Sequence, residues 1–326
     1  MKILGMGNAL VDVLTRIADD KLLDSLNLPK GSMQLIDKER MFELNKELEN
    51  LNKEIVAGGS AANTIVGLSR LGIDAGFVGR VGIDTYGQYY KEDLLLNGVK
   101  LHMSEVEDEM SGVATTLISA DGQRTFGTYL GAAALLAADE LKESDFRGYD
   151  YFYIEGYLVQ SYDLIERAIV LAREAGAKVI LDLASYNVVE EHKEFLIKMI
   201  SRYVDVVFAN EEEAEALYGV EAEEAVSMLA KQTRIAVVKA GERGSWMQCG
   251  NEKIFVVARE VNCIDSTGAG DLYAAGFIFG LMKSCPLRIC GEIGTLLATT
   301  VIQVIGPKIG DDTWSDIKPQ VDSWLI

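Results

Sequence analysis

Apolar and polar positions follow two patterns along most of the chain, one typical of buried strands and one typical of amphipathic helices, and their alternation predicts the fold class. Short apolar runs rich in Val, Ile, Leu and aromatic residues predict buried strands. Between them, apolar residues three and four positions apart predict helices that each lay one face on a sheet. This alternation is typical of βαβ units, and it predicts an α/β fold with a mainly parallel central sheet covered on both faces, a three-layer αβα arrangement. The predicted strands are 2–7, 76–81, 151–155, 178–183, 204–209 and 235–239, and the predicted helices include 37–51, 85–97, 162–175, 192–202 and 221–231.

Two stretches, 11–36 and 111–129, break this rhythm. The second contains two β-prone runs joined at Asp121-Gly122, which is typical of a β-hairpin. Strands that do not fit the βα alternation must leave the main sheet. We therefore expect residues of about 10–36 and 110–130 to form a small β-rich lid inserted into one domain that spans 1–326. A lid over the carboxyl ends of parallel strands would cover the place where such sheets bind ligands.

Composition and charge narrow the classes of function. With 49% hydrophobic residues and only 4 prolines, the chain can bury a large core. Its 50 acidic and 31 basic side chains give a formal net charge of −19, which repels nucleic acids and anionic membranes, so neither is an expected partner. The 4 cysteines form no CxxC pair and only 2 histidines are present, which disfavours disulfides and histidine-rich metal sites. No signal peptide or membrane span is evident, and we expect a cytoplasmic protein.

The segment Asp-Ser-Thr-Gly-Ala-Gly-Asp at 265–271 carries the strongest chemical signal. It follows a β-prone run at 254–264 and precedes an apolar helix predicted at 272–283. A glycine turn before a helix brings free N–H groups together at the positive end of the helix dipole, where anions such as phosphate bind. Asp271 would lie beside that anion, where a carboxylate can accept a proton from a hydroxyl that attacks phosphorus. The same pattern also fits an ordinary helix start capped by Asp271.

Two further glycine-containing segments offer polar groups to a ligand. In Gly-Gly-Ser-Ala-Ala-Asn at 58–63, the glycines permit close backbone approach, and Asn63 can donate to and accept from a sugar hydroxyl. A packed turn with a buried asparagine is the alternative, whereas a nucleophile elbow would need glycine in place of Ala62. The opening Gly-Met-Gly-Asn-Ala-Leu-Val-Asp at 5–12 lacks the third glycine of a dinucleotide fingerprint. Asn8 and Asp12 there suit either ligand contacts or turn capping.

Two polar segments follow predicted strands. Asn210 and Glu213 would share one side of a first helical turn, where oxygen ligands can hold Mg²⁺ through its water shell. Acidic residues that complement a helix dipole are the alternative. The segment Lys-Ala-Gly-Glu-Arg-Gly at 239–244 ends another strand with a glycine loop, which can border a nucleotide or form a plain turn. A Walker A sequence is absent from the chain, which excludes a P-loop kinase.

In this order and spacing, the motifs resemble those of the PfkB family of carbohydrate and nucleoside kinases, also called the ribokinase-like family. The hallmark segments are the ones at 58–63, with Arg-Leu-Gly at 70–72, and at 265–271, and the resemblance covers essentially the whole chain. It implies that Asp271 is the catalytic base and that the N–H groups of Gly268, Ala269 and Gly270 form an anion hole. It also implies that Arg124, on the second hairpin strand, reaches the transferred phosphates.

The resemblance extends to both substrates. It implies sugar-hydroxyl contacts from Asn8, Asp12, Gly58, Gly59 and Asn63, and a role for Asn210 and Glu213 in organising Mg²⁺ and phosphate. The residues implied at ATP are Asn210, Thr267, Lys239, Gly241, Gly244 and Thr295; at 239 the family often has threonine, and at 295 many relatives carry asparagine near the adenine.

Within the family, the segments at 5–12 and 153–157 are most similar to the adenosine kinase branch. This similarity implies that Tyr157 stacks on the nucleoside base, with Leu10 and Phe126 as apolar lid contacts, although Tyr157 also fits a core position at a strand end. Gln34 lies on the predicted lid where adenosine kinases tend to be apolar, which keeps a plain sugar open as the acceptor.

The expected activity is therefore that of an ATP-dependent kinase that phosphorylates a primary hydroxyl of a ribosyl compound, with adenosine as the first candidate. A ribokinase- or fructokinase-like sugar kinase is the alternative within the family, and a non-catalytic nucleoside-binding sensor is the alternative from another class. The implied cofactors are ATP and Mg²⁺, with dependence on a monovalent cation such as K⁺ left open. The expected partner is a small-molecule nucleoside or sugar, and the chain would be a monomer or a homodimer joined through the lid.

Overall fold

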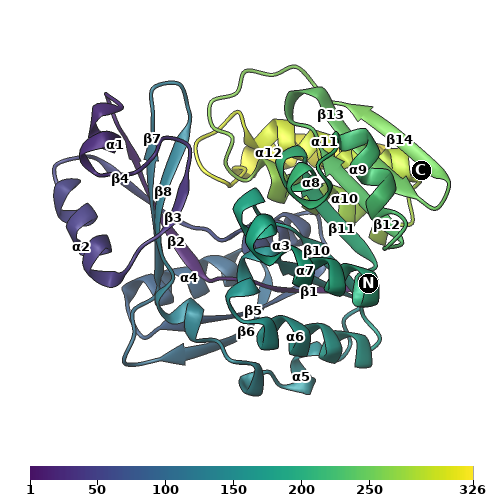
Figure 1. Cartoon of the computed structure of the whole chain (residues 1–326), viewed down its shortest axis with the longest axis horizontal. Coiled ribbons are helices and arrows are strands. Elements are labelled where there is room, and N and C mark those ends of the chain that lie inside the picture. Colours follow the sequence, from purple (N-terminus) through teal and green to yellow (C-terminus); the bar gives the residue numbers. More distant parts are fainter. Residues whose placement is uncertain (326) are drawn as a thin grey trace.

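The computed structural model describes residues 1–325, which form two sheets of unequal size (Figure 1). The larger sheet has the order β14-β13-β12-β11-β10-β9-β1-β5-β6. Its strands from β12 to β6 in that order run parallel, while β13 and β14 continue one edge in antiparallel pairing. The bounds are β1 (Lys2–Met6), β5 (Asp74–Gly82), β6 (Val99–Val106), β9 (Tyr151–Glu155), β10 (Lys178–Asp182), β11 (Val206–Asn210), β12 (Ile235–Lys239), β13 (Gly244–Cys249) and β14 (Glu252–Val257).

Helices cover both faces of this sheet, which confirms the predicted three layers. In β1, Ile3 packs into the apolar core on one face, while Leu4 and Met6 pack into the core on the other. Because both faces are buried, the parallel strands are continuous apolar runs rather than alternating ones. One core includes α3 (Ser60–Arg70), α4 (Thr85–Leu96), α10 (Ala269–Met282), α11 (Leu287–Val301) and α12 (Asp311–Ser323), and the other includes α5 (Glu143–Phe146), α6 (Tyr162–Glu174), α7 (Tyr186–Tyr203), α8 (Glu211–Tyr218) and α9 (Ala222–Leu229).

The smaller sheet stands to one side of the larger one (Figure 1) and has the order β3-β8-β7-β2-β4. The predicted hairpin is confirmed, because β7 and β8 pair antiparallel across a turn in which Gly122 has a φ of 81°. The sheet also includes β4 and is backed by α2, in a segment that the pattern of apolar residues did not assign to it. The bounds are β2 (Leu10–Arg16), α1 (Lys21–Ser25), β3 (Met33–Leu35), α2 (Lys38–Glu47), β4 (Lys53–Ala57), β7 (Gly112–Ile118) and β8 (Arg124–Tyr129).

Two predicted elements differ most from the structure in their bounds. The β-prone run at 254–264 is a strand only as far as Val257, where its pairing with β13 ends, and residues 259–264 are exposed and irregular. The helix predicted from 192 begins earlier, at Tyr186, and His192 has non-helical backbone angles (φ −117°, ψ 20°). The periodicity therefore detected only the part of α7 that follows this kink. Among the helices of residues 1–325, none has the length and apolar character needed to span a membrane.

Candidate active site

A cleft of about 1720 Å³ opens at the carboxyl ends of the parallel strands. Five neighbouring strands, β1, β9, β10, β11 and β12, each place one polar residue there, either as the last residue of the strand or just beyond it. Ligands bind at this edge of open parallel sheets because the strands end there and the loops diverge. These residues are Asn8, Glu155, Asp182, Asn210 and Lys239.

Asp271 lies in the first turn of α10 and lines this cleft. Its carboxylate accepts hydrogen bonds from Ser60 Oγ at 2.7 Å and from Asn63 Nδ2 at 2.9 Å, both on the neighbouring helix α3. Desolvation raises the pKa of Asp271 to about 6, although these two hydrogen bonds act in the opposite direction. A carboxylate with a pKa near neutrality, held in a fixed orientation, suits a general base.

The turn that precedes Asp271 has the geometry of an anion site. Gly268 adopts a left-handed conformation (φ 75°), and a Cβ there would lie 2.9 Å from Pro307 Cα, so the turn requires glycine. Thr267, Gly268, Ala269 and Gly270 line the cleft. The N–H groups in the first turn of a helix have no partner within the helix, and the dipole adds partial positive charge at the same point. The turn thus lies next to the carboxylate of Asp271, where the anion hole was predicted, and one of its N–H groups, that of Ala269, donates to the carbonyl of Ser266 at 3.3 Å.

Lys239 extends from the end of β12 to the same turn. Its Nζ atom would lie 3.2 Å from a Cβ built on Gly270, and it donates to Asp182 Oδ2 at 3.1 Å. The Lys239 side chain is only 17% exposed, and burial by itself would lower its pKa. The carboxylates of Asp182 and Glu213 outweigh that effect and raise the pKa of Lys239. A positive charge is therefore held directly beside the glycine turn.

On the other side of the cleft, Glu155 organises the predicted sugar contacts. Its Oε1 accepts from Asn8 N at 2.9 Å and from Asn8 Nδ2 at 3.2 Å, while its Oε2 accepts from Ala61 N at 2.7 Å. Burial raises the pKa of Glu155 to about 7 despite these hydrogen bonds. Glu155 thereby connects β9, the end of β1 and the start of α3, and it fixes the orientation of the Asn8 side chain.

The smaller sheet presents one face to the cleft. Alternate residues of its strands line the cleft, as expected because successive side chains of a strand point to opposite faces. Met33 and Leu35 line the cleft, so Gln34 between them points to the other face of the sheet. The expectation that Gln34 alters the acceptor surface is therefore wrong. The other lining residues from this sheet include Leu10, Asp12, Ala114, Arg124, Phe126 and Thr128.

Asp12 is a buried carboxylate on this face. Burial raises its pKa to about 7, whereas the charges of Arg124 and Lys308 act to lower it. A Cβ on Gly58 would lie 2.4 Å from Asp12 Oδ2, so Gly58 contributes by leaving room for that carboxylate, whereas Gly59 itself lines the cleft.

Arg124 connects the smaller sheet to the glycine turn. It forms an ion pair with Asp265, the first residue of the 265–271 segment, and both side chains are buried. Asp265 also accepts from Thr267 N at 3.0 Å and from Gly306 N at 2.6 Å. Within residues 1–325, the Nε and Nη1 atoms of Arg124 have no hydrogen-bond partner, although Arg124 lines the cleft. These two atoms are buried as well as unpaired, so Arg124 is held against the turn and its remaining donors reach a ligand only when the side chain moves.

The residues predicted at the ATP side also line the cleft. Asn210 and Glu213 form a reciprocal capping box at the start of α8, with Glu213 N donating to Asn210 Oδ1 and Asn210 N donating to Glu213 Oε2, each at 2.8 Å. Gly241 and Gly244 have positive φ angles, as a tight loop requires, and Thr295 is buried on α11. Capping and ligand binding are compatible here, because the box uses only one carboxylate oxygen of Glu213.

Tyr157 is half-buried and lines the cleft, with its hydroxyl donating to the carbonyl of Ala184 at 3.1 Å. Ala184 has a φ of 75°, which is strained for a residue with a Cβ, at the end of the loop that follows β10. This hydrogen bond fixes the Tyr157 ring between β9 and that loop. The ring is therefore available as a rigid flat surface at the edge of the cleft.

Sequence reasoning missed three residues of the site: Ser60, Glu155 and Asp182. Glu155 and Asp182 are each the last residue of a buried strand, and a charged residue at that position is the signal that could have identified them. Ser60 lay inside a recognised motif, but nothing in the motif indicated that it would bind Asp271.

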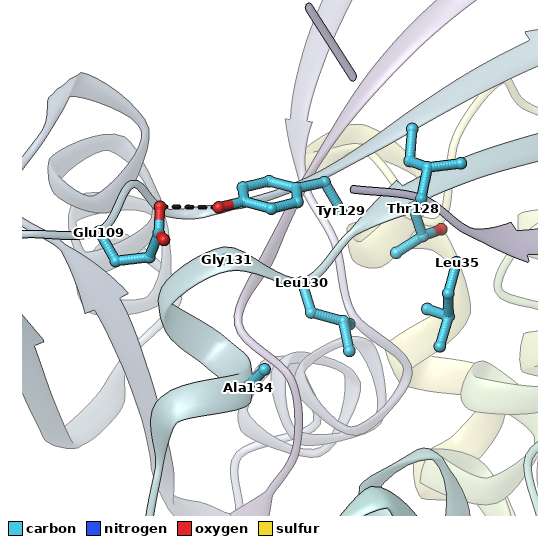
Figure 2. Close-up of a pocket in the computed structure, with 8 residues that line it drawn as sticks. Leu35, Glu109, Thr128, Tyr129, Leu130, Gly131 and Ala134 are labelled. Atoms are coloured by element: carbon cyan, nitrogen blue, oxygen red, sulfur yellow. Dashed lines mark hydrogen bonds between the residues drawn. The ribbon is translucent and has the colours of Figure 1, made fainter. Parts of the chain in front are cut away.

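A second cavity of about 240 Å³ lies where strands β3 and β8 of the smaller sheet end (Figure 2). Leu35, Thr128 and Leu130 line both cavities. Tyr129 donates its hydroxyl to Glu109 Oε1 at 2.7 Å at one side, and Lys38 Nζ donates to the same oxygen at 2.8 Å. This arrangement braces the end of β8, while all the predicted chemistry lies in the larger cleft.

The chain is similar to kinases over nearly its whole length. The family profile described as pfkB family carbohydrate kinase matches residues 30–314. The crystal structure of adenosine kinase from Sinorhizobium meliloti has a TM-score of 0.91 and 31% identity, over 98% of this chain and 99% of that one. Adenosine kinase 2 of Arabidopsis thaliana is 27% identical over 328 residues, covering 93% of this chain and 94% of the relative. Ribokinase of Haemophilus influenzae is 26% identical over 244 residues, covering 72% and 78%.

Proposed function

The chain belongs to the pfkB family of carbohydrate kinases, and we propose that it transfers the γ-phosphoryl group of ATP to a primary hydroxyl of a ribosyl compound, with adenosine as the first candidate. Kinases of this family are phosphotransferases that use ATP and act on hydroxyl groups of sugars and nucleosides. One observation carries the proposal. The carboxylate of Asp271 lies beside a glycine turn at a helix N-terminus, oriented by Ser60 and Asn63 and with a pKa raised to about 6.

The acceptor would bind between the end of β1 and the smaller sheet. Asn8, Asp12 and Asn63, with the backbone at Gly59, would hold the ring hydroxyls, so that the primary hydroxyl points to Asp271. Fixing both reactants in this way replaces a two-body encounter by an oriented one. Asn63 also donates to Asp271, so it would orient the base as well as the sugar.

Adenosine is preferred over a free sugar because of the surface beyond the ribose position. Tyr157 offers a flat ring there, and Leu10, Met33, Leu35 and Phe126 present an apolar face of the smaller sheet. An aromatic ring stacked on a base stabilises binding by about 1 to 3 kcal/mol. A free sugar would leave this apolar surface in contact with water.

ATP would place its terminal phosphate at residues 268–270, with Gly241, Gly244, Thr267 and Thr295 along the rest of the nucleotide. Lys239 would contact the phosphates, and Arg124 would join it when a movement of its side chain uncovers the buried, unpaired N–H groups. Asp271 would accept the proton of the attacking hydroxyl, and the N–H groups of the turn would stabilise the charge on the transferred group.

The donor set at the start of α8 fits Mg²⁺. Asn210 and Glu213 line the cleft with oxygen atoms, which Mg²⁺ prefers, and Glu213 keeps one carboxylate oxygen outside the capping box. These two residues would hold the ion through water molecules. When bound, Mg²⁺ neutralises negative charge on the phosphates.

The smaller sheet, including 10–36 and 110–130, would act as a lid on a single kinase domain and exclude water from the reaction. Cytoplasmic residence fits the four free cysteines, which agree with a reducing compartment that also supplies ATP.

The proposal is tested by ADP release in a coupled assay with adenosine, inosine, ribose, fructose and ketodeoxygluconate, each with and without K⁺. We expect the highest kcat/KM with adenosine. A higher value with ribose or fructose would assign the chain to the sugar kinases instead. Tight adenosine binding by calorimetry with no ADP release from any acceptor would identify a sensor.

The matched variant for this assay is Asp271→Asn, which keeps the shape of the side chain but removes the base. We expect turnover to fall roughly 10²- to 10⁴-fold, the usual contribution of a general base. Circular dichroism and the thermal midpoint should stay close to those of the wild type. Turnover within about threefold of the wild type would contradict the role of Asp271.

A further inference from the structure

The ammonium group of Lys239 is paired with Asp182 and also lies close to the positive end of α10. Its Nζ atom would lie 3.2 Å from a Cβ on Gly270, in the first turn of a helix of 14 residues. That end of α10 carries partial positive charge, which repels a cation. An anion bound beside both Lys239 and the first turn of α10 would be attracted by the ammonium group and by the helix dipole together.

Asp182 holds Lys239 in this position. Asp182 is the last residue of β10, its side chain is 6% exposed, and its Oδ2 lies 3.1 Å from Lys239 Nζ. Strand β11 lies between β10 and β12, so the ion pair crosses the end of one strand. Lys239 is therefore anchored by Asp182 and not by Asp271, which accepts hydrogen bonds from Ser60 and Asn63 instead.

This choice of partner matters for the reaction. A lysine bonded directly to Asp271 would favour the charged carboxylate and weaken it as a base. Because Lys239 is anchored on Asp182, its ammonium group points to the turn. The carboxylates of Asp182 and Asp271 therefore keep different hydrogen-bond partners. The Asp182 charge also acts to raise the pKa of Asp271, whereas Lys239 acts to lower it.

We propose that Lys239 is a catalytic residue that contacts the transferring phosphoryl group, and that Asp182 is a positioning residue that holds Lys239 over the turn and away from Asp271. This inference rests on the proposed kinase function. In the step, the acceptor oxygen forms a bond to the γ-phosphorus while its proton passes to Asp271. The bond from phosphorus to the bridging oxygen breaks, and ADP leaves with that electron pair. Lys239 keeps its protons and stabilises the charge on the phosphoryl oxygens.

The charged and titratable groups that face Asp271 and Lys239 come from several elements. Each contributes to the electrostatic potential at the site of phosphoryl transfer. Besides Asp182 of β10, they are Glu213 of α8, Glu155 and Tyr153 of β9, Asp12 of β2 and Tyr157 of the turn at 156–160.

The test is a double-mutant cycle on the full chain with Lys239→Met, Asp182→Asn and the combined variant. Removing one donor to a developing charge lowers kcat by about 10²- to 10³-fold, which is our expectation for Lys239→Met, with the KM of the acceptor nearly unchanged. Asp182→Asn should lower kcat at least about tenfold in the wild-type background and less than about threefold when Lys239 is already Met, because it acts through that lysine. Effects that simply multiply would overturn the assignment of Asp182.

A pH profile separates positioning from a merely structural role. Without the Asp182 carboxylate, the pKa of Asp271 should fall, because a negative charge that raises it is gone and Lys239 is free to turn toward it. The acidic limb of kcat/KM for Asp182→Asn should therefore move to lower pH. A limb that stays where it is in the wild type would refute the positioning role.

Folding and background effects are controlled by three variants. Asp182→Asn leaves a buried cation without its partner, which is destabilising, whereas the combined variant removes both charges and should keep a thermal midpoint nearer the wild type. Asp182→Glu retains the charge and should restore part of the turnover. Lys253→Met is the matched control, because Lys253 lies on β14 and pairs with Glu223 away from the cleft.

The inference can fail separately from the proposed function. If the wild type releases no ADP with any acceptor, the proposed function fails, and the anion contact is then tested with inorganic tripolyphosphate by calorimetry. Lys239→Met should weaken its binding at least about tenfold and Lys253→Met should not, since only Lys239 faces the turn. Equal binding by both variants would rule out the contact.

Discussion

Two opposing influences set the basicity of Asp271. Its burial favours the neutral carboxyl, and the hydrogen bonds from Ser60 and Asn63 favour the carboxylate, with a resulting pKa of about 6. A fully exposed aspartate would be a weaker base, and one without these donors would have a higher pKa. The two α3 side chains thus keep Asp271 ionised at neutral pH while its desolvation keeps it basic.

We predict that kcat/KM falls as the pH drops through about 6, because protonated Asp271 cannot accept the hydroxyl proton. The carboxylate form of Asp271 predominates above this pKa, and burial raises the pKa values of Asp12 and Glu155 to about 7, so the activity should level off only above neutral pH. The measurement is kcat/KM for the acceptor across that range, since this constant reports groups of the free enzyme. A profile that stays flat down to about pH 4.5 would show that another group is the base.

Ser60→Ala should move this acidic limb to higher pH. The Ser60 hydroxyl donates to the charged carboxylate at 2.7 Å, so its loss disfavours the charged form and raises the pKa of Asp271. Ser69→Ala is the matched control, because Ser69 lies on the same helix but donates to the carbonyl of Asn97. If the acidic limb of kcat/KM lies at the same pH in both variants, Ser60 has no influence on the pKa of Asp271.

Among the secondary-structure elements, α10 depends on a turn whose backbone only glycine tolerates. Gly268 has a φ of 75°, and a Cβ there would meet the backbone of Pro307 at 2.9 Å. Gly72 has a φ of 89°, but a Cβ there has nothing within 4 Å. The two glycines share the conformational requirement, and only Gly268 adds a steric one.

We predict that Gly72→Ala lowers the free energy of unfolding by about 1 to 2 kcal/mol, the cost of a left-handed residue with a Cβ. Gly268→Ala should lower it further and also reduce turnover, because the turn must move away from Pro307. Urea unfolding and the kinetic assay measure both effects. Equal destabilisation of the two variants with full turnover would show that the turn adapts without a cost to catalysis.

Strand β8 reaches the same turn through the ion pair of Arg124 with Asp265. Both side chains are buried, so neither can exchange its partner for water without a large desolvation cost. Asp265 also accepts two backbone N–H groups, one from the turn itself at Thr267. The smaller sheet and the anion site are consequently connected by a polar contact as well as by the chain.

Across the whole molecule, the elements predicted best from the sequence are the strands that are buried on both faces of the large sheet. Strands β9 and β12 were predicted with their bounds because fully buried strands are continuous apolar runs. Strand β4 was missed because it is an edge strand whose first three residues are exposed, so it shows no such run. Asp182 was missed because it is a single polar residue outside any motif, and Glu155 because nothing in the 153–157 segment indicated its role. Only the parallel order of the strands brings the two residues beside Lys239 and Asn8.

Edge strands also bear on whether the chain associates with itself through the smaller sheet. At the β4 edge, Lys53 and Glu54 are exposed charges, and the carbonyl of Ile55 already accepts from Tyr89 of α4 at 3.0 Å. Charges on an edge and an occupied carbonyl both disfavour pairing with a second strand. The opposite edge is β3, a strand of only three residues.

We therefore predict that this chain is a monomer, with a mass near 35.7 kDa by light scattering coupled to size exclusion. The net charge of −19 acts in the same direction, because two copies repel each other, more strongly at low ionic strength. A mass of twice that value at physiological salt would contradict the prediction. In that case Ile55→Lys, which adds a charge to β4, would separate the copies only if the pairing runs through this edge.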